Sequence, residues 1–238
     1  RILAGLKRAE VVFHPTQEIR RQILDHGLVD PVRLVYAPLG VDPAFFHATA
    51  DLHSADALIN DFTRGRPFIL NVGSCIPRKR IDVLLDAFAH LRKHHPDLRL
   101  VQVGGTWTPV QQRQIEGRNL LPHLVQLRGL PTATLAAIYH RAAVVVQPTE
   151  AEGFGLPLAE ALASGAAVVT SDLPVLHEVG GNAAVFVPVG DAEAFAHAVD
   201  AELTRHVAPP RETRVMRARR FSWEVHATTI ASAYAERI

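Results

Sequence analysis

Short apolar runs alternate with longer amphipathic segments from Arg66 onward. Continuous apolar runs of this kind are typical of strands that are buried on both faces of a sheet. Between the first two runs, Ile81–His94 is a predicted helix, because its spacing places Leu84 and Phe88 on one face. The predicted strands are Pro67–Gly73, Leu98–Gly105, Leu124–Gly129, Ala142–Pro148, Ala166–Ser171 and Ala183–Val187.

An alternation of buried strands and helices is typical of a parallel sheet that is covered by helices on both faces. We therefore predict an α/β fold with a Rossmann-like, doubly wound parallel sheet. In such sheets, ligands bind beyond the carboxyl ends of the strands. The loops that follow the predicted strands are therefore the expected location of functional residues.

The first part of the chain has a different pattern. Ala9–Thr16 is a predicted strand, Gln17–Gly27 is a predicted helix, and Pro31–Phe46 is predicted to run extended because it contains three prolines. One strand and one helix cannot bury a core alone. We therefore expect this part to belong to a preceding domain.

These patterns divide the chain into two parts. Residues 1–40 are the predicted remnant of an amino-terminal domain, with its last strand and helix and a linker. Residues 41–238 are a predicted Rossmann-like domain that ends in an amphipathic helix over 221–238. Residues 51–64 are polar and their pattern is ambiguous. Because the chain begins with Arg1 and not with methionine, we expect further sequence upstream.

Composition narrows the classes of function. Hydrophobic residues make up 48% of the 238 residues, which excludes a disordered chain. Lys and Arg total 25 and Asp and Glu total 24, and this balance argues against a nucleic-acid partner. No apolar run reaches the roughly 18–20 residues of a membrane span. The single cysteine, Cys75, excludes an internal disulfide and fits a reducing compartment, so we expect a cytoplasmic location.

The loop after the fourth predicted strand reads EAEGFGLPLAEALASG. Gly153 and Gly155 allow backbone N–H groups to approach a ligand, and Pro157 suits the first turn of a helix. The amino end of a helix attracts anions, and the carboxylates of Glu152 and Glu160 can accept hydrogen bonds from sugar or ribose hydroxyls. A plain glycine turn with two capping glutamates remains the alternative.

The loop after the first predicted strand reads GSCIPRKRID. It places Arg78, Lys79 and Arg80 at the amino end of a helix, where the helix dipole disfavours cations. An anion such as a diphosphate would explain their presence, and a solvated basic turn is the alternative. Both loops follow strands of one parallel sheet, so we expect them at the same edge.

A second group of basic residues lies near the end of the chain. It could face an anionic lipid surface or another domain, and a solvated helix face is the favoured interpretation. The chain contains neither the P-loop motif nor a dinucleotide-binding glycine motif after the first strand, which argues against ATP hydrolysis by a P-loop and against a standard dehydrogenase. The basic residues are Arg211, Arg214, Arg217, Arg219 and Arg220.

The stretch EGFGLPLAEALASGAAVVTSD resembles the E-x7-E signature of retaining glycosyltransferases with the GT-B fold, in the glycogen-synthase and mannosyltransferase-like group (glycosyltransferase family 4, group 1). NVGSCIPRKRIDVLLDAF resembles the phosphate-binding segment of that group. RAEVVFHPTQEIRRQIL and VYAPLGVDPAFF resemble the end of its amino-terminal domain and the linker, and FSWEVHATTIASAYAERI resembles its closing helix. The resemblance covers nearly the whole chain, but only the carboxyl-terminal, donor-binding half of a complete enzyme.

The resemblance implies a role for each matching position. Lys79, with Arg78, would bind the donor diphosphate, and Lys79 and Glu152 would be the catalytic residues. Glu152 would contact the sugar hydroxyls, Glu160 the ribose, and the backbone near Leu130 the base. Family members use cations instead of a metal, so no metal and no cofactor besides the nucleotide-sugar substrate is expected. Backbone contacts to the sugar and phosphate are implied for Gly153, Phe154, Gly155 and Leu156.

Two positions depart from the family pattern. Ser74, which we expect among the residues that bind the donor phosphate, stands where many members have arginine, and Arg80 stands where many have glycine. Either Arg78 or Arg80 could compensate for the arginine that Ser74 replaces. The acceptor site and a functional histidine belong to the amino-terminal domain, which this chain almost wholly lacks.

We therefore predict the donor-binding domain of a retaining, metal-independent glycosyltransferase. The full enzyme would transfer a hexosyl group from a UDP-, GDP- or ADP-linked sugar to a sugar, polysaccharide or lipid acceptor, and this chain alone would bind the nucleotide but be inactive. The alternatives are a nucleotide-sugar epimerase on the same fold and a non-catalytic nucleotide- or glycan-binding module. Peripheral contact with the inner face of the membrane is a further option.

Overall fold

The computed structural model describes residues 2–47 and 52–236. Within these residues, a six-stranded, fully parallel sheet forms the centre of the larger part of the molecule, in the order β5-β4-β3-β6-β7-β8. All six predicted strands are confirmed, and the order is that of Rossmann dinucleotide-binding folds. The strands are β3 (Phe68–Val72), β4 (Arg99–Val103), β5 (Leu124–Leu127), β6 (Val144–Gln147), β7 (Val168–Ser171) and β8 (Val185–Val187).

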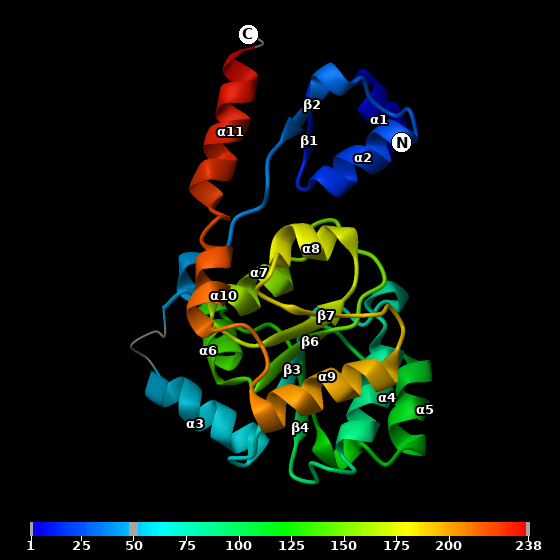
Figure 1. Ribbon diagram of the computed structural model, residues 1–238, viewed down its shortest axis with the longest axis vertical. Coiled ribbons are helices and arrows are strands. Elements are labelled where there is room, and N and C mark those ends of the chain that lie inside the picture. The colour runs from blue at the N-terminus through cyan, green and yellow to red at the C-terminus, as the bar shows by residue number, and fades with distance from the viewer. Residues whose placement is uncertain (1, 48–51, 237–238) are drawn as a thin grey trace.

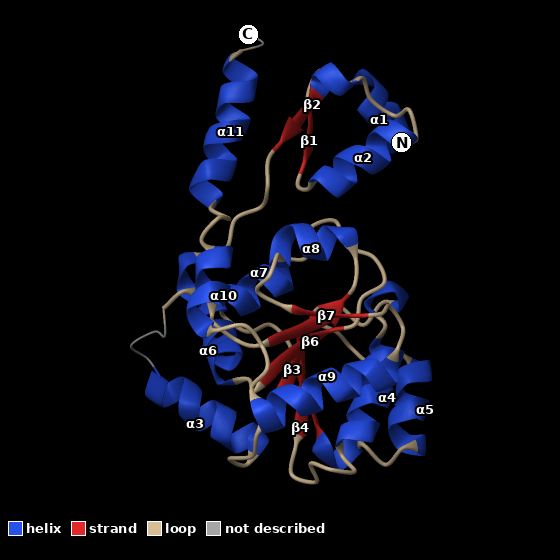
Figure 2. Cartoon of the chain, in the orientation of Figure 1, coloured by secondary structure: helices blue, strands red, loops and turns tan. Residues whose placement is uncertain are grey.

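Helices cover both faces of this sheet, as Figure 2 shows. Neighbouring strand residues point to opposite faces, so Ile69 packs in a core with Phe88 and Phe195, whereas Leu70 packs in a second core with Tyr139. The first core includes residues of α4 (Ile81–Leu91), α5 (Pro109–Gly117) and α9 (Ala192–Arg205). The second includes residues of α3 (Leu52–Thr63), α6 (Thr132–Arg141), α7 (Leu156–Ala163), α8 (Pro174–Gly180) and α10 (Arg211–Ala218).

One predicted boundary needs correction, and one ambiguous segment is resolved. The helix predicted to reach His94 ends at Leu91, whose carbonyl oxygen accepts bonds from His94 N and His95 N at 3.0 and 2.8 Å. Pro96 disfavours helical backbone at the residue before it, which explains the early end. In the ambiguous segment 51–64, α3 spans Leu52–Thr63 and Arg64 lies in the turn that follows.

The amino-terminal part is a small α/β unit with α1 (Ile2–Arg8), β1 (Val12–His14), α2 (Gln17–Asp25) and β2 (Leu34–Tyr36). β1 and β2 pair in parallel, with Val12 opposite Leu34. The expectation of a single strand followed by an extended linker is therefore wrong, because β2 and a 3₁₀ turn at Pro31–Arg33 lie in the predicted linker. The prolines of this segment favoured a linker, and the partner strand β1 lies on the other side of α2 in the sequence. The division at residue 40 stays a prediction.

The chain ends in helix α11 (Trp223–Ala235), which rises away from the large sheet beside β1 and β2 (Figure 1). Ser222 begins this helix by accepting bonds from Glu224 N and Val225 N. Tyr234 packs edge-on against Phe13 of β1, with ring centroids 5.8 Å apart. The predicted terminal helix is confirmed over these residues, and positions 237–238 lie outside the described part. No helix in the described residues combines the length and the hydropathy needed to cross a membrane.

Candidate functional site

The two loops that the sequence singles out lie side by side at the carboxyl edge of the sheet. One follows β3 and the other follows β6, and these strands are neighbours. The backbone N–H of Glu150 donates to the carbonyl oxygen of Arg78 at 2.9 Å, and Thr149 Oγ1 donates to the same oxygen at 3.0 Å. The direction in which the strand order runs changes between β3 and β6, which is where such sheets bind their ligands.

An ion pair between Lys79 and Glu152 joins these loops. Lys79 Nζ donates to Glu152 Oε1, and the two side chains are only 12% and 8% exposed. Arg78 Nη1 donates to Ala151 O at 2.8 Å and lies 3.3 Å from Glu152 Oε2. The lysine ammonium group thus already has an anionic partner, and a diphosphate at this place would have to share or displace it.

Backbone geometry sets the position of Lys79. Its side chain folds over Gly73, where an added Cβ would lie 3.7 Å from Lys79 Cε. The next residue, Arg80, has a left-handed φ of 47°, a conformation that favours glycine and costs other residues about 1–2 kcal/mol. This explains why the family pattern has glycine at this position. Arg80 instead pairs with Asp82 at 2.8 Å and with Glu150 at 3.5 Å.

The turn after Glu152 is anchored in the core. The Phe154 ring is buried and packs edge-on against Phe221 at 5.2 Å. Gly155 has φ +90° and closely contacts α8, since an added Cβ would lie 2.7 Å from Leu176 Cδ2. Leu156 then begins α7, so the amino end of this helix lies at the same edge as the ion pair. Such a helix end favours anions.

Glu160 lies further along α7 and has a different partner. Tyr139 Oη of α6 donates to Glu160 Oε2 at 2.9 Å. Burial raises the pKa of Glu160 above its ordinary value, and the bond from Tyr139 opposes this shift. Within the described residues, no hydrogen bond or ion pair connects Glu160 to Lys79, so its predicted role at the ribose stays a prediction.

Ser74 and Leu130 also lie at the carboxyl edge. Ser74 is exposed and follows β3 by two positions, and Leu130 is half-buried after a left-handed Gly129 beyond β5. Their predicted contacts with phosphate and base stay predictions. Gly105, after β4, makes room for the β3 loop, because an added Cβ would lie 2.3 Å from Cys75 Sγ.

A row of polar side chains, of which Asn71 and Gln102 are buried and which the sequence analysis missed, connects the strand ends below these loops. Asn71 Nδ2 donates to Val146 O at 2.8 Å, and Gln102 Nε2 donates to Gly73 O at 2.7 Å. Gln126 Nε2 in turn donates to Gln102 Oε1 at 3.0 Å. Satisfied buried networks of this kind hold one arrangement of the backbone, and here they fix the start of the β3 loop.

A second contact that the sequence analysis missed ties the amino-terminal unit to the site. Thr16 Oγ1 donates to Gly153 O at 3.1 Å and also caps α2. Glu178 of α8 accepts bonds from the N–H groups of Gln17 at 2.8 Å and Glu18 at 3.2 Å. Thr16 was recognisable as a helix cap, but no local pattern indicates a partner 137 positions away.

The favoured interpretation of the basic residues near the end as a solvated helix face is wrong for part of the group. Arg211 Nη1 donates to Ser164 O at 2.8 Å, at the end of α7, and Arg217 Nε donates to Val179 O at 2.8 Å, at the end of α8. Helix carboxyl ends attract cations. These arginines therefore pack α10 against α7 and α8.

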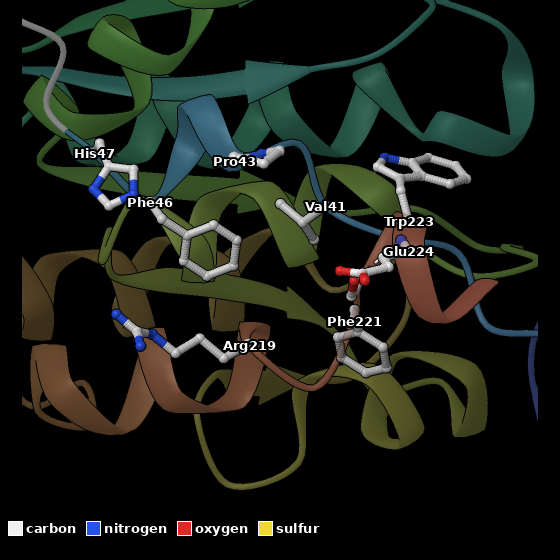
Figure 3. Close-up of a pocket in the computed structure, with 9 residues that line it drawn as sticks. Val41, Pro43, Phe46, His47, Arg219, Phe221, Trp223 and Glu224 are labelled. Carbon is white, nitrogen blue, oxygen red and sulfur yellow. Dashed lines mark hydrogen bonds between the residues drawn. The ribbon is translucent and has the colours of Figure 1, made fainter. Parts of the chain in front are cut away.

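A separate pocket of about 450 Å³ lies where the linker passes the start of α11 (Figure 3). Val41, Phe46, Arg219 and Phe221 line it, and none of its lining residues is a predicted site residue. Phe221 also contacts Phe154, so this side of the pocket packs against the turn that follows Glu152.

The strand order defines a Rossmann-like protein, and the ion pair at the switch point and the helix amino end mark a candidate ligand site at the carboxyl edge of its sheet. The family model of glycosyl transferases group 1 matches residues 57–219. The chain therefore belongs to the group 1 glycosyltransferase family, which confirms the resemblance at the level of the family.

Named relatives agree with this assignment. The phosphatidyl-myo-inositol mannosyltransferase of Mycolicibacterium smegmatis is 34% identical over 212 residues, which cover 84% of this chain and 51% of that protein. The O-antigen chain mannosyltransferase B of Escherichia coli is 32% identical over 70% of this chain and 45% of its own length. The chain spans about half the length of the curated relatives it matches.

Solved structures share the fold. A sucrose-phosphate synthase from Thermosynechococcus elongatus aligns with a TM-score of 0.82 and 26% identity, over 99% of this chain and 60% of that one. Anabaena Alr3699/HepE in complex with UDP and glucose aligns with a TM-score of 0.84 and 15% identity, over 98% of this chain and 65% of that one. The Rossmann-like parallel fold predicted from the sequence is confirmed.

Proposed function

We propose that this chain is the donor-binding half of a retaining, metal-independent glycosyltransferase that transfers a hexosyl group from a nucleotide-diphosphate sugar. The observation that carries the proposal is the Lys79–Glu152 ion pair at the switch point of the sheet. Names of relatives support it, since two are mannosyltransferases and one structural neighbour is a complex with UDP and glucose.

In this proposal the cations neutralise the leaving diphosphate. Lys79 and Arg78 supply positive charge where negative charge develops as the sugar–phosphate bond breaks, an electrostatic role that requires no metal. Arg78 is the better replacement for the arginine missing at Ser74, because its side chain is 46% exposed and Arg80 is already paired with two carboxylates. The amino end of α7 adds a further favourable field.

The carboxylates hold the donor's hydroxyl groups. Glu152 can accept bonds from the transferred sugar while it remains beside Lys79, which places the sugar next to the phosphate. Glu160 would accept from the ribose, with Tyr139 fixing the orientation of its carboxylate. The backbone at residues 153–156 would contact the sugar and phosphate, and that near Leu130 the base.

The acceptor belongs to the part of the enzyme outside this chain. We propose a sugar, polysaccharide or lipid acceptor, and a location in the cytoplasm with peripheral contact at the inner face of the membrane. The chain alone would bind a donor nucleotide without appreciable turnover, because the acceptor side of the site is supplied by the amino-terminal domain.

Calorimetric titration of the chain with UDP, GDP and ADP tests the proposal. We expect at least one of them to bind, and the Lys79→Ala variant to bind it at least tenfold more weakly. Lys93→Ala is the matched control, because Lys93 is an exposed cation just beyond the opposite end of α4. No binding of any nucleotide at millimolar concentration refutes the proposal.

A second experiment separates transfer from the alternative chemistry. The full-length enzyme is incubated with a nucleotide-sugar, with and without acceptors, and the products are identified. We expect glycosylated acceptor with retained anomeric configuration. An epimerised nucleotide-sugar in acceptor-free buffer, or binding without any turnover, would contradict the assignment.

A further inference from the structure

Basic side chains gather at the amino edge of the sheet, at the opposite end of the strands from Lys79 and Glu152. Arg66 lies just before β3, Arg99 begins β4 and His123 lies just before β5, and these three strands are neighbours. Arg92, just after α4, contacts His123. Arg64 lies in the turn before Arg66. We call the four arginines and His123 the amino-edge cluster.

The arginines of this cluster donate mainly to backbone carbonyl oxygens and seldom to carboxylates. Arg99 Nη1 donates to Pro122 O at 3.2 Å, and Arg92 Nη1 donates to Pro96 O. Within residues 2–47 and 52–236, the one ion pair of the cluster joins Arg66 Nη1 to Asp97 Oδ1 at 3.5 Å, and Asp97 is 72% exposed. Carbonyl dipoles orient guanidinium groups but do not neutralise them, so the cluster keeps an excess of positive charge.

Two buried N–H groups in the cluster lack an acceptor. Arg92 Nη2 lies 2.8 Å from His123 Nε2. A guanidinium group only donates, so Nε2 must accept and the imidazole proton is assigned to Nδ1. Within the described part of the chain, His123 Nδ1 and Arg99 Nε are both buried without a hydrogen-bond partner. Buried donors are nearly always paired, so these two call for an acceptor.

The electrostatics agree with this geometry. Arg99 is 6% exposed, and burial, followed by the charges of Arg64, Arg66 and Arg92, lowers its pKa from the ordinary arginine value. Burial and then the charges of Arg92, Arg99 and Arg66 lower the pKa of His123. The cations are thus crowded in a partly desolvated place, where their mutual repulsion is strong and a counter-anion would relieve it.

We propose that the amino-edge cluster binds an oxyanion, namely inorganic phosphate or the phosphomonoester group of a small solute. Such a group offers several acceptor oxygens for the unpaired N–H groups, and its negative charge would balance the positive charge of the arginines. Guanidinium groups match its oxygens in paired, planar hydrogen bonds. Arg64 and Arg66 are exposed, so the cluster is open to solvent on their side. This site lies at the other edge of the sheet from the donor site and does not depend on the proposed function.

Phosphate titration with a site-resolved signal tests the proposal. The imidazole resonances of His123 are followed by NMR while inorganic phosphate replaces chloride at constant ionic strength. All proteins carry Lys79→Ala, which removes the main cation of the donor site. We expect a saturable shift of the His123 signal, and affinity at least tenfold weaker in Arg66→Gln and Arg92→Gln. Arg21→Gln on α2 is the matched control for loss of one positive charge and should bind as the parent does.

Each remaining outcome decides the matter. No shift beyond that in chloride, or an equal loss in the Arg21→Gln control, overturns the proposal, because the effect would then be general screening. Circular dichroism of each variant shows that it is folded, so a lost site is not mistaken for a lost fold. A second arm of the experiment uses vesicles of phosphatidylcholine with phosphatidic acid. If the protein sediments with these vesicles and Arg92→Gln does not, the ligand is a lipid phosphomonoester. If the protein binds phosphate but not the vesicles, the ligand is a free solute.

Discussion

Replacement of Glu152 by glutamine is expected to tighten the binding of a bare nucleoside diphosphate. The variant keeps the size of the side chain but removes its negative charge. Lys79, which donates to Glu152 in the structure, would then be free to meet the diphosphate. A nucleotide-sugar gains less, because the sugar hydroxyls lose a charged acceptor.

The size of the effect follows from the burial of the pair. Both side chains are at least 88% buried, so solvent screens the pair only weakly. A charge-assisted hydrogen bond contributes about 1.5–3 kcal/mol and a neutral one about 0.5–1.5 kcal/mol. The charge of Glu152 therefore opposes diphosphate binding by about 1–1.5 kcal/mol, which corresponds to roughly fivefold to thirteenfold in affinity.

Calorimetry measures this with whichever of UDP, GDP and ADP the parent chain binds, together with the matching nucleotide-sugar. Glu150→Gln is the matched control: it removes the same charge from the same loop, but Glu150 is 44% exposed and lies 3.5 Å from Arg80. Its effect should stay within about twofold, since exposed pairs contribute little.

An unchanged or weaker affinity of Glu152→Gln for the bare diphosphate would refute the reasoning. It would mean that Lys79 and the diphosphate do not meet, or that the ligand does not compete with the ion pair. Equal tightening in Glu150→Gln would point to a general charge effect.

Three further outcomes are expected. Lys79→Ala should reduce diphosphate affinity by about 1.5–3 kcal/mol, measured by calorimetry. Thr16→Val should lower the free energy of unfolding by about 0.5–2 kcal/mol in urea, because it removes a helix cap and the bond to Gly153. Burial raises the pKa of Glu160, so between the ordinary glutamate pKa and the raised one the folded state binds more protons than the unfolded chain. The free energy of unfolding should therefore fall as the pH rises through that window. Urea unfolding from about pH 4, near the ordinary glutamate pKa, to about pH 7 measures this fall, and Glu160→Gln should remove it.

Each of these outcomes has its own check. Lys93→Ala should leave nucleotide affinity unchanged, and an equal loss there would remove Lys79 from the site. Thr16→Ser keeps the hydroxyl and should recover most of the stability; if it behaves like Thr16→Val, the methyl group and not the hydrogen bond is responsible. Parallel pH profiles of the parent and Glu160→Gln would show that the folded protein does not perturb this carboxyl.

Local sequence was sufficient for the core of the fold. The six strands of the large sheet are mostly apolar, because residues such as Ile69 and Leu70 are buried on opposite faces. The prediction failed at β2, because its apolar residues Leu34–Tyr36 lie in a segment with three prolines that was interpreted as a linker. Helix α4 ends earlier than predicted for a local reason, because Pro96 disfavours helical backbone at His95.

The residues of the candidate site could be predicted from the sequence, but their partners could not. Glycines, cations and carboxylates after β3 and β6 were recognisable, and a parallel sheet necessarily brings such loops to one edge. That Lys79 and Glu152 form a pair across 73 positions, and that Tyr139 and not a neighbouring cation holds Glu160, depends on side-chain directions that no local pattern encodes.

The sequence by itself determined which segments are buried, because the hydrophobic pattern is a property of short segments. It also determined which loops share an edge, because the loops that follow the strands of a parallel sheet all lie at its carboxyl edge. The tertiary structure alone decided the partners of the charged groups. Arg211 and Arg217 have the local pattern of a solvated surface, yet they donate to carbonyl oxygens at the ends of α7 and α8. The energy of a charge depends on what surrounds it within a few ångströms, and those surroundings come from distant parts of the chain.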